Sequence, residues 1–152
     1  MTKDTPIDTT QLSPHDWEQA SNSYLMAVVA VIAGLPLPII NVIASVVFYL
    51  THLRSSYFVR WHCIQSILSQ AIMTPFNSTA IAWSLKLLIN RQEPGFYFFI
   101  YLFAVAIFNL IEFFTVIITA AQVRKGINVR WFLIANLTDA LCSKQNRDPY
   151  RI

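Results

Sequence analysis

Glycine and charged residues are both scarce in this sequence of 152 residues. It contains three glycines, and 12% of its residues are charged, whereas soluble domains average about 25%. So few glycines make a phosphate-binding loop improbable, and neither a nucleophile elbow nor a zinc signature occurs. We therefore expect a protein that is not an enzyme and that holds no cofactor and no metal.

Cysteine is sparse as well, and the positive charge is modest. Cys63 and Cys142 provide neither a metal-binding spacing nor a disulfide framework, so we interpret both as small apolar residues. The net charge is +3, and the basic residues flank the apolar runs instead of forming a separate basic face. Nucleic acid is therefore not an expected partner.

Long uncharged stretches are what the chain has instead. No charged residue occurs between positions 24 and 50, and Glu112 is the only one between 96 and 123. Runs of this length exceed the roughly 18 apolar residues that indicate a transmembrane helix. Residues 24–51 are the first apolar block, residues 61–89 are the second and less apolar one, and residues 96–123 are the third. The predicted fold class is an all-α membrane protein with three transmembrane helices, in contact with lipid.

The predicted organisation has three parts. Residues 1–23 are a polar segment in which Ser13-Pro-His-Asp16 predicts the start of a short surface helix. Residues 24–141 form the membrane-embedded domain, and 142–152 form a polar tail. Within the domain, residues 131–141 are too few to span and predict an amphipathic helix in the interface.

A proline-containing stretch, Gly34-Leu-Pro-Leu-Pro38, interrupts the first apolar block, residues 24–51. Each proline removes a helical hydrogen bond and clashes with the preceding turn. One interpretation is a single kinked span. The other is two half-helices in a re-entrant hairpin, which would return the N-terminus to the side of the basic loop at 52–61.

The second block carries a polar stripe. The side chains at positions 62, 66, 70, 74 and 78 step by four and therefore stack on one drifting face of a helix, which Gln65 and Ser69 widen. Because amides and hydroxyls are costly in hydrocarbon, this face should turn toward protein or a wet cavity. The stripe either joins helices or lines a pathway. Its candidate contact residues are Gln65, Ser66, Gln70, Thr74 and Asn77.

Glu112 is the sharpest single feature, because it lies in the middle of the third block, with Asn109 nearly one turn earlier. A carboxylate at the centre of a bilayer costs roughly 2.5–3.5 kcal/mol, so it normally faces a partner or a cavity. Three roles are open. Glu112 joins its helix to the polar stripe, pairs with a helix of another subunit, or takes part in transport.

The distribution of basic residues predicts the orientation. With three spans, the side that holds the C-terminus carries eight Lys and Arg residues: Arg54, Arg60, Arg124, Lys125, Arg130, Lys144, Arg147 and Arg151. The other side carries three: Lys3, Lys86 and Arg91. The positive-inside rule then predicts a multi-pass protein of the inner (cytoplasmic) membrane with a cytoplasmic C-terminus.

The junction between the basic loop and the second block has the residue types of a water–lipid boundary, with Arg60, Trp61 and His62 in sequence. Its sequence, Phe58-Val-Arg-Trp-His-Cys-Ile-Gln65, resembles a recurring motif of one family. These are small bacterial membrane proteins related to the twenty-kilodalton component of the protein translocon in the chloroplast inner envelope. Ala121-Gln-Val-Arg-Lys-Gly126 and the aromatic segment after it are similar to the exit of that family's last span.

The resemblance implies a helical membrane protein that acts near protein translocation. Together with the polar stripe and Glu112, it leads us to expect a non-enzymatic small integral membrane subunit that packs against a larger inner-membrane complex, with a function in protein translocation or export. The alternative is a small oligomeric channel or transporter that uses the intramembrane carboxylate, in which case the partner is a second copy of the chain.

Overall fold

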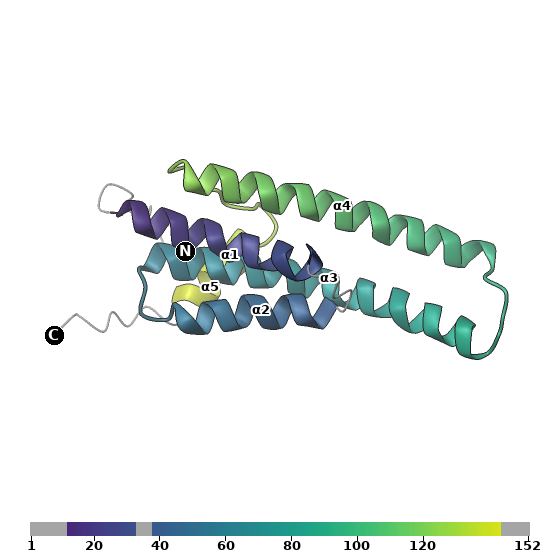
Figure 1. The fold of residues 1–152 in the computed structure, drawn as a ribbon. Coiled ribbons are helices and arrows are strands. Elements are labelled where there is room, and N and C mark those ends of the chain that lie inside the picture. The colour runs from purple at the N-terminus through teal and green to yellow at the C-terminus, as the bar shows by residue number, and fades with distance from the viewer. Residues whose placement is uncertain (1–11, 33–37, 144–152) are drawn as a thin grey trace.

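The computed structural model describes residues 12–32 and 38–143, and within these ranges the protein is all-helical (Figure 1). The helices are α1 (Pro14–Ile32), α2 (Pro38–Thr51), α3 (Tyr57–Ile89), α4 (Phe96–Arg124) and α5 (Ala135–Ser143). The predicted all-α class is confirmed, and the second and third apolar blocks are helical as expected. Residues 1–11 of the predicted 1–23 segment, the break at 33–37 and residues 144–152 of the predicted tail lie outside the described residues.

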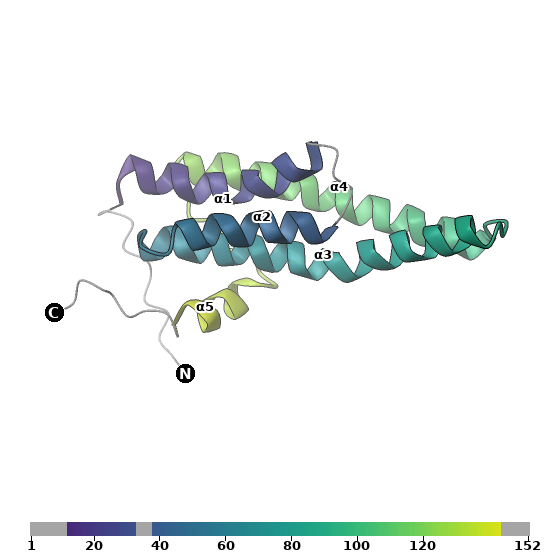
Figure 2. The same cartoon turned by 60° about the horizontal axis from the view of Figure 1, so that its bottom comes forward.

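The first apolar block forms two antiparallel helices. The start of α1 lies beside the loop that follows α2, where Ser56 Oγ donates to Asp16 Oδ1 (2.8 Å) and Ser55 Oγ donates to Gln19 Oε1 (3.1 Å). Figure 2 shows α1 and α2 side by side, both reaching only part of the way along α3. The structure therefore favours a hairpin over a single kinked span, because α1 and α2 run in opposite directions and both pack on α3. Entry of this hairpin into a membrane stays a prediction.

The predicted helix start at Ser13 is confirmed. Ser13 Oγ accepts from the backbone N–H of Asp16 (3.2 Å), and Asp16 Oδ2 accepts from the backbone N–H of Ser13 (3.0 Å). This reciprocal pair satisfies two amides that have no partner within the helix. From there α1 continues without interruption past Tyr24, so the polar segment and the first apolar residues share one helix.

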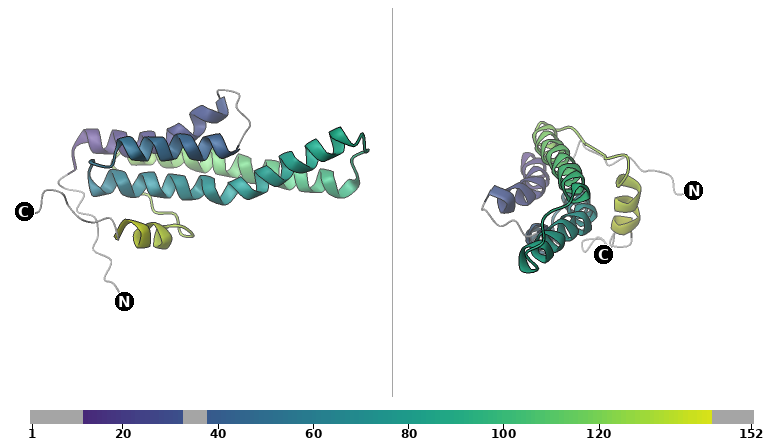
Figure 3. Two further views of the ribbon diagram at one scale, coloured as in Figure 1. Left: turned by 90° about the horizontal axis from the view of Figure 1, so that it is seen from below. Right: turned by 90° about the vertical axis from the view of Figure 1, so that its right-hand side faces the viewer.

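The two ends of the bundle differ in construction. At the near end, which holds the loop at 52–56, α1, α2, α3 and α4 lie together, whereas at the far end, which holds the turn at 90–95, α3 and α4 continue alone (Figure 3). The main apolar core belongs to the near half. Its buried members are Ala20, Tyr24, Val28, Phe58, Val59, Cys63, Val116, Ala120 and Val123. In the far half, the ring of Trp83 packs on Phe98 and Tyr101, with centroids 5.6 and 5.8 Å away.

Among the described helices, only α4 is both long enough and apolar enough to cross a bilayer. Only 17% of its most apolar window is buried, whereas the core helix of a soluble protein is mostly buried. The longer α3 carries the polar stripe together with Arg60 and Lys86, and α2 has 14 residues. The prediction of three transmembrane helices is thus supported for one helix only.

The C-terminal amphipathic helix exists but begins later than predicted. Residues 132–134 form a turn, and α5 covers Ala135–Ser143 against the start of α3. Ala135, Thr138 and Cys142 form its buried face. Trp131 precedes the helix, and both its backbone N–H and its indole N–H donate to other parts of the bundle, to Gln65 Oε1 and Thr119 Oγ1.

Candidate functional site

The predicted polar stripe of α3 divides into two groups at different heights in the bundle. The Gln65 network, nearer the loop at 52–56, consists of Tyr24, His62, Gln65, Thr119 and Trp131. The Glu112 cluster, nearer the middle of α3 and α4, consists of Ser69, Gln70, Asn77, Asn109 and Glu112. The Gln65 network joins α3 to α1 and to the segment after α4, whereas the Glu112 cluster joins α3 to α4.

Gln65 is the centre of the first group and is fully buried. Its amide nitrogen donates to Tyr24 Oη (2.8 Å) and to the backbone carbonyl of Val129 (3.2 Å), and its Oε1 accepts from the backbone N–H of Trp131 (3.2 Å). Tyr24 Oη also lies 2.8 Å from His62 Nδ1. One side chain of α3 therefore connects α1 to the segment that follows α4.

Three further side-chain hydrogen bonds join the elements of the near half to one another. The indole N–H of Trp131 donates to Thr119 Oγ1 (2.9 Å), Ser66 Oγ donates to the carbonyl of Ser23 (3.0 Å), and Ser21 Oγ donates to the carbonyl of Ala120 (2.9 Å). Small polar side chains of this kind let helices approach closely and join them by hydrogen bonds. The candidates Gln65 and Ser66 thus have an internal structural role.

The side chains of the junction residues Trp61 and His62 are covered by other helices. Both are 0% exposed, because α5 covers Trp61 and α1 covers His62. Trp61 Nε1 donates to Asp139 Oδ1 (2.7 Å), and the guanidinium of Arg130, which pairs with Asp139, lies 5.2 Å from the Trp61 ring centroid. Both side chains therefore contact neighbouring helices, and their depth in a membrane stays a prediction.

Arg60, the third junction residue, is half-buried, and its charge lies near Cys142 of α5. Burial raises the pKa of the Cys142 thiol to about 12, despite the opposing effect of Arg60.

Cys63 and Cys142 are both free and buried, as the interpretation of ordinary apolar residues requires.

Glu112 is bonded to α3 within the same chain. Its Oε1 accepts from Ser69 Oγ (2.9 Å) and from Gln70 Nε2 (3.0 Å). One helical turn away along α4, Asn109 and Asn77 bond reciprocally, with amide nitrogen to oxygen distances of 2.7 and 3.0 Å. Of the three roles that the sequence left open, the geometry favours the contact between helices, because the partners of Glu112 are already present.

A cavity of about 100 Å³ lies beside the Glu112 cluster, which is room for a few water molecules. It is lined by Val28, Asn41, Gln70, Met73, Thr74, Asn77, Asn109, Glu112, Phe113 and Val116. Thr74, another candidate, faces this cavity while its hydroxyl donates to the carbonyl of Gln70 in its own helix (2.8 Å).

Asn41 is the residue that the sequence reasoning missed here. It extends from α2 to the cavity, and its Oδ1 is buried without a hydrogen bond from the described residues. A signal was present in the sequence, because Asn41 is the only amide side chain in α2, an otherwise strongly apolar helix. Tyr24, Trp131 and Asp139 were missed as well, since nothing in their spacing relates them to α3.

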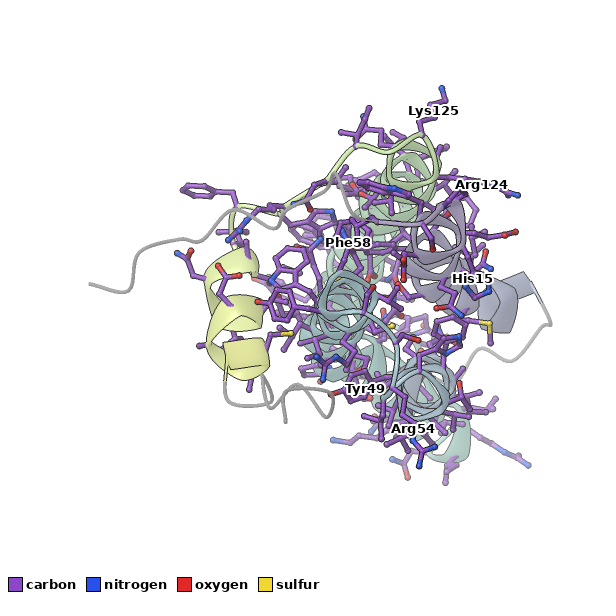
Figure 4. The ribbon with its side chains drawn as sticks, turned by 90° about the vertical axis from the view of Figure 1, so that its left-hand side faces the viewer. His15, Tyr49, Arg54, Phe58, Arg124 and Lys125 are labelled. Atoms are coloured by element: carbon purple, nitrogen blue, oxygen red, sulfur yellow. The ribbon has the colours of Figure 1, made fainter. Side chains whose placement is uncertain are left out.

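In the part of the chain that the structure describes, no group of three or more His, Cys, Asp or Glu side chains is placed to hold a metal ion. At the near end (Figure 4), Arg54 lies in the loop after α2, and Arg124 and Lys125 lie where α4 ends, on the opposite side. Arg124 pairs with Glu18 of α1 across 3.5 Å, with both side chains more than half exposed.

Comparisons with protein-family models, with curated proteins and with solved structures found no match for this chain. The family resemblance at residues 58–65 and 121–126 therefore stays a prediction.

Proposed function

We propose that this protein is a non-enzymatic integral membrane subunit that packs against a larger inner-membrane complex. The observation that carries the proposal is the division of polarity on α4. Phe99, Phe103 and Phe108 are more than half exposed, whereas Asn109 and Glu112 turn toward α3. In water such a continuous apolar surface is unfavourable, but in a bilayer the arrangement is the favourable one.

The proposed topology has α3 and α4 crossing the membrane and the α1–α2 hairpin entering from one side and returning. At 1.5 Å per residue, α3 with 33 residues and α4 with 29 are about 50 and 43 Å long, enough for a hydrocarbon core of about 30 Å. By the same measure α2, with 14 residues, is about 21 Å long and too short to cross.

The near end faces the cytoplasm in this proposal. Among the described residues it holds five basic side chains, Arg54, Arg60, Arg124, Lys125 and Arg130, whereas the far end holds Lys86 and Arg91. The positive-inside rule then places the C-terminal helix on the cytoplasmic side, and the hairpin brings α1's start to that side too.

A function in protein translocation or export rests on the family resemblance alone.

The far half of α3 and α4 is the surface that we assign to the partner complex. There no other described helix packs on the pair, and Leu88, Phe96, Tyr97 and Phe103 are more than two-thirds exposed. The test is affinity purification of the tagged protein from its own membrane in mild detergent, with mass spectrometry of the co-eluting proteins. A stoichiometric larger membrane protein is the expected result.

A pair of variants makes this test specific. Tyr97→Ala with Phe103→Ala should reduce recovery of the partner, whereas Ile118→Ala, an exposed apolar residue of the near half, should not. Purification of the protein alone, or equal recovery with both variants, would refute the assignment of this surface.

A second candidate function is a small oligomeric channel or transporter. The cavity beside Glu112 favours it, because a polar space next to an intramembrane carboxylate is the usual setting of an ion path. Reconstituted in liposomes, such a protein would conduct ions, and Glu112→Gln would change the flux. Absence of flux with the wild-type protein would eliminate this candidate.

A further inference from the structure

We infer that the cavity between α2, α3 and α4 is a binding site for a monovalent metal cation that keeps part of its hydration shell. The inference goes beyond the role as a subunit. It uses the same carboxylate as the second candidate function but does not require transport, since a bound ion can equally hold the hairpin against the other helices.

The cavity lining offers oxygen acceptors from three helices. Glu112 receives both of its hydrogen bonds from the described residues at Oε1, so a carboxylate with about four acceptor positions retains capacity. Asn41 contributes an amide oxygen with no donor among the described residues, and the Thr74 hydroxyl has given its proton to the carbonyl of Gln70. Such a set of acceptors requires a ligand that brings positive charge or donors.

Charge balance supports a cation in particular. Glu112 is the only acidic residue in the lining, and no lysine, arginine or histidine is among the lining residues. An ionised carboxylate in an environment of low dielectric is costly unless a positive charge accompanies it. Anions are disfavoured for the same reason.

The number and type of ligands point to a monovalent ion. Ca²⁺ usually takes six to eight oxygens, and Mg²⁺ demands a near-ideal octahedral shell. The single carboxylate of this cavity balances one positive charge, which matches a monovalent ion and leaves a divalent ion half neutralised. Zinc and similar metals prefer imidazole and thiolate, which the lining lacks. A volume of about 100 Å³ accommodates Na⁺ or K⁺ with a few waters but leaves little space for a large organic cation.

The geometry also explains why the space beside the helix contact is retained. Met73, Phe113 and Val116 line the same cavity, and these apolar side chains would fill it if the polar groups had only to join α3 to α4. The reciprocal pair of Asn77 and Asn109 already makes that contact one turn away.

The test is thermal unfolding of the purified full-length protein in an uncharged detergent, followed by tryptophan fluorescence. Ionic strength is held constant while choline chloride is exchanged for NaCl or KCl. The expected result is a rise in the unfolding midpoint of about 3 °C at saturating Na⁺ or K⁺ relative to choline. Calorimetric titration with NaCl in choline buffer should give a matching dissociation constant.

Variants separate a bound ion from a general effect of salt. Glu112→Gln preserves the shape of the side chain and should weaken binding by at least roughly tenfold. Asn41→Leu should weaken it without disturbing the bonds of Glu112 to α3, and it serves as the test if Glu112→Gln does not fold. Glu18→Gln, which removes an exposed carboxylate at the near end, should leave the response unchanged.

An equal midpoint in choline, Na⁺ and K⁺ would overturn the inference, and so would a response that persists in both cavity variants. Binding without flux in liposomes would support the site and eliminate transport. Loss of the partner complex from the affinity purification would bear on the proposed subunit role alone, so the two failures are distinguishable.

Discussion

Replacing Gln65 by Leu should detach the segment after α4 from the rest of the bundle. The substitution keeps the size of the side chain but removes three hydrogen bonds, to Tyr24 Oη, the Val129 carbonyl and the Trp131 N–H. Hydrogen bonds between membrane helices average about 0.6 kcal/mol, and those in soluble proteins about 1 kcal/mol, so the expected loss of stability is about 2–3 kcal/mol. Tyr24 retains His62 as a partner, whereas the two backbone groups do not gain a substitute.

The assay is reversible unfolding in mixed micelles with increasing SDS, compared between Gln65→Leu and Gln92→Leu. Gln92 lies exposed in the turn at 90–95, so the same chemical change there should alter stability by less than about 0.5 kcal/mol. Trypsin supplies an independent readout, because cleavage after Arg130 should become faster only in Gln65→Leu. Equal unfolding of the two variants, with equal cleavage, would refute the role assigned to Gln65.

Four further outcomes are expected. Cys142 should not react with maleimide at pH 8 until the protein is unfolded in SDS, because burial raises its pKa to about 12 and leaves it 2% exposed. Asp139→Ala should speed the maleimide labelling of Cys142 in the folded protein. The substitution removes two contacts that hold α5 in place, the hydrogen bond from the Trp61 indole and the ion pair with Arg130. An unchanged labelling rate would show that other contacts hold α5. Phe108→Arg, at a 60% exposed position near the middle of α4, should cost up to about 3 kcal/mol on insertion and reduce carbonate-resistant membrane recovery, whereas Phe108→Leu should not. Partial burial raises the pKa of Asp16, but hydrogen bonds from two serines outweigh this effect and lower the pKa below 3.8. The stabilisation by Asp16 is therefore complete above the pKa of the unfolded state and is lost as the pH falls through the lower pKa of the folded state. Asp16→Asn should thus make the stability of the protein depend less steeply on pH in the acid range.

The sequence by itself determined the helical class and most helix limits. Two features are local signals that correspond to features of the structure: the Ser13 cap with Pro14 at the first helical position, and the apolar run of α4, in which Glu112 is the only charge before Arg124. It also singled out Glu112, Asn109, Gln70 and Asn77, because polar groups in an apolar run must face something polar wherever the helix lies. The four side chains do meet, since two adjacent antiparallel helices bring their polar faces together.

The tertiary structure alone decided which partners these residues have. Prolines at 36 and 38 predict a break, but whether the chain then continues or reverses depends on the packing of α1 and α2 against α3. That reversal brings Tyr24 to His62 and Gln65, and it brings Asn41 to the cavity beside Glu112. The cover of Trp61 and His62 was not foreseen, because aromatic and basic residues at a helix start are typical of an interface, and only the positions of α5 and α1 show that both side chains are buried. Local periodicity determines which face of a helix is polar, whereas the long-range contacts between helices determine what that face meets.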